Sequence, residues 1–385
     1  MSCSKIFSGD LPELTYGIIK YLQNDFLTLH SCILVNRLWC RLTIPLLWEN
    51  PFSIPTKNYK FIEIYLQNLN DNDFKTNLNI YKINDNLFYL NTLFNYTSFI
   101  KDINLLKVIT SVGKWFEDSV RTLKPGNRYF LQNLDIHSES NFKRLIYISL
   151  FKTFIENEVN LNTLNIDIFT IYSYEPYYDD IIVLILQNSN FIHNIKNLNL
   201  YFGSSSPNIL YHNNSTSEYK LLKSQILQIT HLVSNLIESI NHNLNYLSIH
   251  IKEIYQFNYN VDYTSTILQN LGQILPSKLE YLSLSLSIKK SDFKIFLENS
   301  QNIFINRLLI MQKGNDDILY YIKEFIMKEK RVKYLAIKNF GNIDLSTLED
   351  EVNEFMLYNI KVLNFCELYL AIRAYEFVKN IDYYL

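Results

Sequence analysis

Residues 278–286 read KLEYLSLSL, and stretches of this kind decide the fold of the chain. The leucines alternate with aromatic and small polar residues, which is the period of two that a β-strand shows when one face is buried. The same residues fit a longer template, apolar-x-x-Leu-x-apolar, which runs from Leu279 through Leu282 to Leu284. A template that returns at a regular interval would make this strand one unit of a repeat.

The template occurs eight times after residue 130. Its central leucines are Leu134, Leu164, Leu198, Leu247, Leu282, Leu308, Leu335 and Leu363, and successive steps measure 30, 34, 49, 35, 26, 27 and 28 residues. Between copies the apolar period lengthens to about 3.6, as in Phe142, Ile146, Leu150 and Phe154. Each unit therefore reads as strand, turn and helix, and such units bury their apolar faces only by stacking.

These units resemble an irregular leucine-rich-repeat solenoid, or horseshoe, of the α/β class. The family's usual Asn or Cys, three residues after the last apolar position, is absent from all eight copies. We therefore expect less uniform curvature than in a regular horseshoe. The alternative is a mixed helical and strand domain in which the repeats are coincidental. Two later helices have expected starts, a capping box from Ser346 to Glu349 and a cap at Ser291 and Asp292.

Side chains that flank the central leucines point away from the core, onto the face that would be concave in a solenoid. Aromatic residues and Arg are frequent anchors of protein interfaces. A target protein is therefore expected to contact candidates on this face, namely His137, Tyr201, Tyr246, His250, Tyr281, Arg307 and Tyr334. A polar concave face is also a general property of solenoids, so these residues could equally have no partner.

The first fifty residues predict three short helices. The apolar residues Leu11, Leu14, Ile18, Tyr21 and Leu22 recur at helical spacing, with Asp10 and Glu13 placed to cap the first helix. The second helix is expected to start near Asp25 and the third to run from Arg37 to Trp48. About forty residues are too few to enclose a full hydrophobic core alone. Part of their apolar surface must therefore contact another chain or the rest of this one.

The string LPELTYGIIKYLQNDFLTLHSCILVNRLWCRLTIPLLWENPF, from Leu11 to Phe52, resembles an F-box, and in particular fungal F-box-like proteins. The resemblance rests on Leu-Pro-Glu, Leu-Val-Asn-Arg-x-Trp and Ile-Pro-Leu-Leu-Trp. It implies a helical module that docks on the Skp adaptor of a Skp-cullin-F-box ubiquitin ligase and, through it, on a cullin. The adaptor contacts implied are Leu11, Pro12, Ile18, Leu22, Leu29 and Val35, with Trp39 and Trp48 as internal anchors.

The expected organisation is an F-box-like domain at 8–52, a helical linker region at 53–130 and a leucine-rich-repeat-like domain at 131–385. With this organisation the resemblance implies a substrate receptor, not an enzyme, that works in the cytoplasm or nucleus and uses no cofactor. A repeat scaffold without a role in ubiquitin transfer is the main alternative. A hydrolase whose site is assembled from distant residues is a third possibility.

Composition argues against several other classes. The net charge of −2 does not predict a nucleic-acid or anionic-membrane surface. The longest apolar run, 181–186, is far shorter than the roughly 20 residues that span a bilayer. The eight glycines form no phosphate-binding loop or nucleophile elbow, and the seven histidines show no metal-ligand spacing. The four cysteines form no C-x-x-C pair, so we expect buried free thiols.

Overall fold

The computed structural model describes most of the chain and divides it into two compact units. The described residues are 11–23, 25–54, 58–67, 69, 74, 81, 92–122, 136–170, 177–204, 228, 230–251, 263–339 and 341–369. The units divide between Leu161 and Asn162. The first unit thus holds both the segment 8–52 and the region expected to link it to the repeats, and it extends beyond the expected boundary at residue 130.

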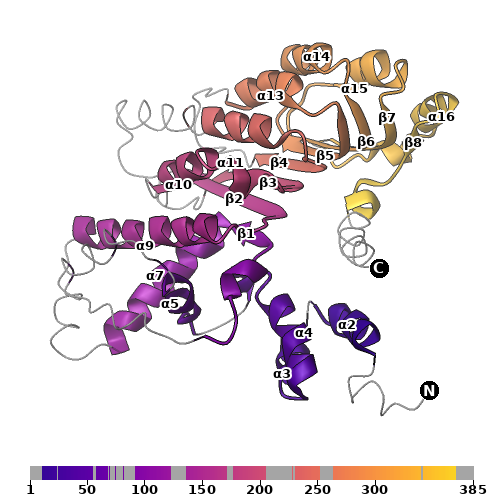
Figure 1. Cartoon of the computed structure of the whole chain (residues 1–385). Helices are drawn as coiled ribbons and strands as arrows, with labels where there is room; N and C mark the ends of the chain where they lie inside the picture. The colour runs from indigo at the N-terminus through magenta and orange to yellow at the C-terminus, as the bar shows by residue number, and fades with distance from the viewer. Residues whose placement is uncertain are drawn as a thin grey trace. The chain divides into compact units, whose positions relative to one another are not determined.

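The first unit is mainly helical (Figure 1, indigo to magenta). Its elements are α2 (Pro12–Tyr21), α3 (Phe26–Ile33), α4 (Arg37–Leu47), η1 (Pro51–Ser53), α5 (Phe61–Leu66), η3 (Tyr96–Phe99), β1 (Asp102–Asn104), α7 (Leu105–Thr122) and α9 (Ile136–Glu156). The three helices expected in the first fifty residues are therefore confirmed.

Local side chains explain where these helices begin. Helix α3 starts next to Asp25 as expected, and Asp25 caps it by accepting a hydrogen bond from the Thr28 N–H. Asn36 does the same for α4 and accepts from the Trp39 N–H at 2.9 Å. Helix α2 differs from the expectation, because its N-cap is Leu11, which makes no side-chain cap, and Asp10 lies outside the described residues.

Of the first template copy, only the last position lies among the described residues. Leu131 and Leu134 lie outside the described residues, and Ile136 is the first residue of α9. The helical stripe that follows determines the structure at this point, because its four members are all at most 1% exposed: Phe142, Ile146, Leu150 and Phe154. An ion pair between Lys143 and Glu139, one turn apart, supports the same helix.

The second unit is a parallel sheet whose strands alternate with helices. Its elements are β2 (Thr163–Thr170), α10 (Tyr177–Leu186), α11 (Ser189–Ile192), β3 (Asn197–Ser204), a helix over 230–240, β4 (Tyr246–Ile251), α13 (Tyr263–Ile274), β5 (Lys278–Leu286), α14 (Lys290–Asn299), β6 (Phe304–Gln312), α15 (Leu319–Ile322), η4 (Lys323–Met327), β7 (Val332–Lys338), η5 (Leu345–Thr347), α16 (Glu349–Leu357) and β8 (Lys361–Val362). The strands pair in chain order, each parallel to the next.

The register of this sheet confirms the template from the second copy to the seventh. Leu164, Leu198, Leu247, Leu282, Leu308 and Leu335 are direct partners across the six strands and are at most 1% exposed. The eighth copy is displaced by one residue, since Leu335 pairs with Val362 and not with Leu363. Strand β8 is only two residues long because the chain turns at Asn364, whose side chain accepts the Cys366 N–H.

Helices α13, α14 and α15 lie together on one face of the sheet (Figure 1, orange). The central leucines are buried, as are helix residues such as Leu271, Phe293 and Ile322, as expected for a core between a sheet and its covering helices. Neither expected cap in this unit forms. Ser346 lies inside η5 and α16 starts at Glu349 without a side-chain cap, while Ser291 and Asp292 lie inside α14.

Candidate interaction surfaces

The three N-terminal helices share a small apolar core. Its buried members are Ile19, Leu29, Cys32, Trp39, Leu46 and Leu47. Trp39 is therefore the internal anchor that the sequence predicted. The adaptor contact implied for Leu29 stays a prediction, but in this conformation the side chain is 0% exposed. The reason is its position in the middle of α3, which faces α4.

The same helices expose many large apolar side chains. Pro12, Ile18 and Val35 are exposed, and Leu11 and Leu22 are half-buried, so five of the six expected contact residues remain accessible. On α2, Ile19 faces the core, whereas Leu14, Ile18 and Tyr21 of the expected apolar stripe face outward. The exposed apolar side chains are Leu14, Ile18 and Tyr21 on α2, Leu27 on α3, and Leu34 and Val35 after it, at 39 to 85% exposure.

The segment after α4 joins these helices to the rest of the first unit through aromatic contacts. The Trp48 ring lies 4.1 Å from that of Tyr96 and 5.6 Å from that of Tyr65. Phe52 packs on Phe61 and Tyr65. Trp48 therefore anchors the motif to the following helices, so the N-terminal module is continuous with the first unit.

Glu49, which lies between Trp48 and Phe52 in the sequence, has an unusual environment. Burial, and secondarily the Asp102 carboxylate, raises the pKa of Glu49 from 4.5 to about 7, although Lys101 and Lys20 act in the opposite direction. The Gln23 amide donates a hydrogen bond to its Oε2 at 2.8 Å. Its backbone carbonyl accepts the N–H groups of Lys101 and Asp102. The residue thus ties α4 to the chain before α7.

The sheet face opposite the helices carries the flanking side chains in three rows, and we call it the row face. The first row contains Thr163, Asn197, Tyr246, Tyr281, Arg307 and Tyr334; the second Asn165, Asn199, Ser248, Ser283, Leu309 and Ala336; the third Asp167, Tyr201, His250, Ser285, Met311 and Lys338. In-register pairing of parallel strands is what places equivalent repeat positions side by side.

Neighbours within a row contact each other. The rings of Tyr201 and His250 stack at 4.6 Å, and those of Tyr246 and Tyr281 at 4.2 Å. The Arg307 guanidinium lies 5.6 Å from the centre of the Tyr334 ring. Of the seven expected target contacts, the structure thus brings six onto the row face. His137 is the exception, because it lies in the first turn of α9.

Part of the row face is covered by the C-terminal turn that follows β8. Phe365 and Leu368 pack on Tyr281, Leu309 and Ala336 in one buried cluster. The target contact expected at Tyr281 stays a prediction, but the cover leaves this side chain only 2% exposed. Sequence reasoning missed this cover because it treated every flanking position as solvent-facing. Tyr201, Tyr246, His250, Arg307 and Tyr334 remain half-buried and reachable.

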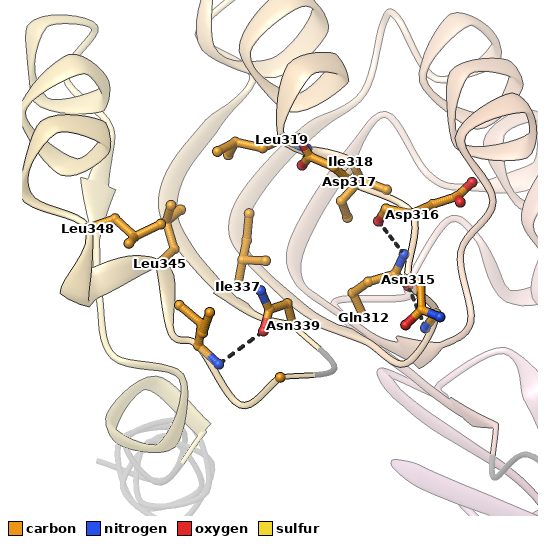
Figure 2. Close-up of a pocket in the computed structure, with 13 residues that line it drawn as sticks. Gln312, Asn315, Asp316, Asp317, Ile318, Leu319, Ile337, Asn339, Leu345 and Leu348 are labelled. Atoms are coloured by element: carbon orange, nitrogen blue, oxygen red, sulfur yellow. Dashed lines mark hydrogen bonds between the residues drawn. The ribbon is translucent and has the colours of Figure 1, made fainter.

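A pocket of about 360 Å³ lies at the carboxyl ends of β6 and β7, where the two strands lead into their loops (Figure 2). Ligands of open α/β sheets bind at this edge. The lining residues are Gln312, Gly314, Asn315, Asp316, Asp317, Ile318, Leu319, Ile337, Asn339, Gly341, Ile343, Leu345 and Leu348. The sequence carries one signal for this pocket, since two of only eight glycines, Gly314 and Gly341, follow successive template copies.

The described residues offer little for metal or membrane chemistry. Nowhere in them do three His, Cys, Asp or Glu side chains gather as metal ligands could. Of the described helices, none is both long and apolar enough to cross a bilayer. Three cysteines are free thiols, but only Cys32 is buried, and Cys366 is exposed, contrary to expectation. Asp167 and His250 are separated by Tyr201 in the third row, an arrangement that does not favour a Ser-His-Asp triad with Ser285.

Comparison with known proteins gives no further guide: no family model matches the chain, and neither a curated protein nor a solved structure matches it significantly.

Proposed function

We propose that the chain is the substrate-recognition subunit of a Skp-cullin-F-box ubiquitin ligase. The N-terminal helices would hold a Skp-type adaptor, and an irregular leucine-rich-repeat solenoid, 162–369, would hold a target protein. The chain would perform no covalent step itself but would bring the target close to the conjugating machinery.

The observation that carries the proposal is the apolar surface of the first three helices. Six large apolar side chains stand exposed on a module of about forty residues that has its own small core. Exposed apolar surface gathered in this way is typical of a protein interaction site. Two residues of the Leu-Val-Asn-Arg-x-Trp string also have a structural role, since Asn36 caps α4 and Trp39 is buried in the core of the module.

Co-purification with a purified Skp-type adaptor tests the proposal. The wild-type chain is expected to retain the adaptor, and the double variant Ile18→Asp, Val35→Asp to lose at least tenfold in affinity, because both side chains are exposed and carry apolar contact area. Leu357→Asp is the matched control, since Leu357 is 82% exposed on α16 in the other unit. Circular dichroism verifies that each variant is folded.

Two results would contradict the receptor function. One is a wild-type chain that retains no adaptor, which would leave a repeat scaffold as the better description. The other is a double variant that binds as tightly as the Leu357→Asp control. The row face favours neither outcome, because it would serve a scaffold and a ligase receptor equally well.

A further inference from the structure

We propose that the pocket between the β6 and β7 loops binds a polypeptide segment in which a large apolar residue stands next to a Lys or Arg. The proposal extends the proposed function by naming the chemistry of the bound segment, and it rests on that function only for the identity of the segment as part of a target. Four features of the pocket support it.

The first loop is held in place by an amide clamp. Gln312, 3% exposed, accepts the Ile288 N–H and donates to the carbonyls of Ile288 and Asp316, each at 2.8 to 2.9 Å. The dashed line between Gln312 and Asp316 in Figure 2 marks one of these bonds. A loop fixed in this way loses little conformational entropy when a ligand binds.

The second loop is held by its own polar side chains. Asn339 accepts the Ile343 N–H at 3.0 Å, which closes the turn after β7. Asp344 accepts the Ser346 N–H at the start of η5 and, through its other oxygen, the Phe365 N–H. Both walls are thus formed before any ligand arrives, as is usual for binding pockets.

Six of the thirteen lining residues are apolar, and two of these apolar side chains continue onto the surface. Figure 2 shows Leu345, Leu348 and Ile337 facing Ile318 and Leu319 across the hollow. The volume of about 360 Å³ falls in the usual range for a binding site and is large enough for one bulky side chain. Ile343 and Leu348 are 49% and 41% exposed, so apolar contact extends beyond the pocket along the path of a longer chain.

The rim of the pocket is acidic. Asp316 and Asp317 are exposed on one loop, and Glu349 and Asp350 follow Leu348 on the other. None of the described lining residues is Lys, Arg or His. The neighbouring Lys323 is already engaged by Glu351 and Glu354 of α16. Asp316 and Asp317 each accept one backbone N–H, from Lys290 and Leu319, and these neutral donors fix the two carboxylates in place. The carboxylates can then attract a cation beside the apolar anchor.

A peptide array probed with the full chain tests this inference. Twelve-residue peptides in a Gly-Ser background carry two adjacent central positions varied over all residue types. We expect retention to concentrate on pairs of one large apolar residue with Lys or Arg. Retention that favours acidic pairs, or no retention at all, would overturn the proposal.

Pocket variants then locate the binding by fluorescence polarisation with the best peptide. Asp317→Asn with Glu349→Gln, and separately Ile343→Trp, which fills the hollow from an exposed position, should each weaken binding at least fivefold. The matched controls are Glu298→Gln on α14 and Leu357→Trp on α16, both exposed. Unchanged binding in both pocket variants would disprove the site. Because no adaptor is present in this assay, its result is independent of the co-purification result.

Discussion

At the residue scale, a carboxyl group just after α4 departs clearly from ordinary chemistry. Glu49 is partly buried between Trp48 and the chain before β1, and it faces Asp102. Because burial and a like charge both disfavour the ionised form, the folded state holds its proton up to about pH 7. The unfolded chain releases the same proton near pH 4.5, so the residue links stability to pH.

We expect the Glu49 contribution to favour folding fully below pH 4.5 and to be lost as pH rises to about 7 and above. Glu49→Gln keeps the hydrogen-bonding shape without the charge. It should therefore be more stable than wild type at pH 8, by at most about 3 kcal/mol, and closer to wild type at pH 4.5. Urea unfolding at the two pH values measures the difference. Glu298→Gln is the control, and a pH-independent gain for Glu49→Gln would contradict the explanation.

At the scale of elements, the contact between α13 and α14 shows how neighbouring repeat helices fit together. Gly272 lies so close to α14 that an added Cβ would stand 2.6 Å from the Phe296 carbonyl oxygen. Asp292, expected as a cap, is instead 7% exposed and accepts hydrogen bonds from Ser265 and Gln269 of α13. A small residue and a buried polar cluster together set the spacing of the two helices.

Two Gly→Ala substitutions should therefore have opposite effects. Gly272→Ala is expected to destabilise the second unit by about 1 to 3 kcal/mol, because the helices must separate to admit the methyl group. Gly113→Ala in α7, where the added Cβ meets nothing within 4 Å, should stabilise by up to about 1 kcal/mol through helix propensity alone. Thermal unfolding followed by circular dichroism measures both. Equal effects of the same sign would show that helix spacing is not set at Gly272.

At the scale of the molecule, the second unit is built from neighbour-to-neighbour pairings. The strands from β2 to β8 are hydrogen-bonded in chain order, each to the next, and one column of leucines runs through six of them. Stability in such an array is approximately a sum over repeats and their interfaces. A destabilising substitution in a central repeat should therefore increase local unfolding of that repeat and its neighbours more than unfolding of the distant repeats.

Leu282→Ala tests this view, because Leu282 is fully buried at the centre of β5. Large-to-small changes at such positions cost about 2 to 5 kcal/mol. We expect hydrogen exchange to rise most in β4, β5 and β6 and to change little in α5 and α9 of the first unit. An increase of equal size in both units would mean that the chain opens as one cooperative body. Leu357→Ala, at an exposed position, is the control.

Much of this architecture could be predicted from residues alone, and particular residues show why. The central leucines gave the strands of the second unit because a two-residue period and a repeated step are properties of the chain itself. The same reasoning was wrong at His137, where the helical stripe of α9 begins immediately afterwards and outweighs one strand-like match. The helix starts expected near Asp25 and Arg37 form, whereas the caps expected at Ser291 and Ser346 do not, because a capping pattern competes with the tertiary contacts around it.

The sequence by itself determined the order of strand and helix, the positions of the leucine column and the three N-terminal helices, since all of these depend on local period and composition. Only the tertiary structure decided which candidate contact residues are accessible, because the C-terminal turn covers Tyr281 and Leu29 lies on the inner side of α3. The pocket too depends on folding, for its two walls come from loops separated by an entire strand and helix. Such surfaces form where segments distant in the sequence come into contact, and the spacing of residues along the chain does not indicate which segments do so.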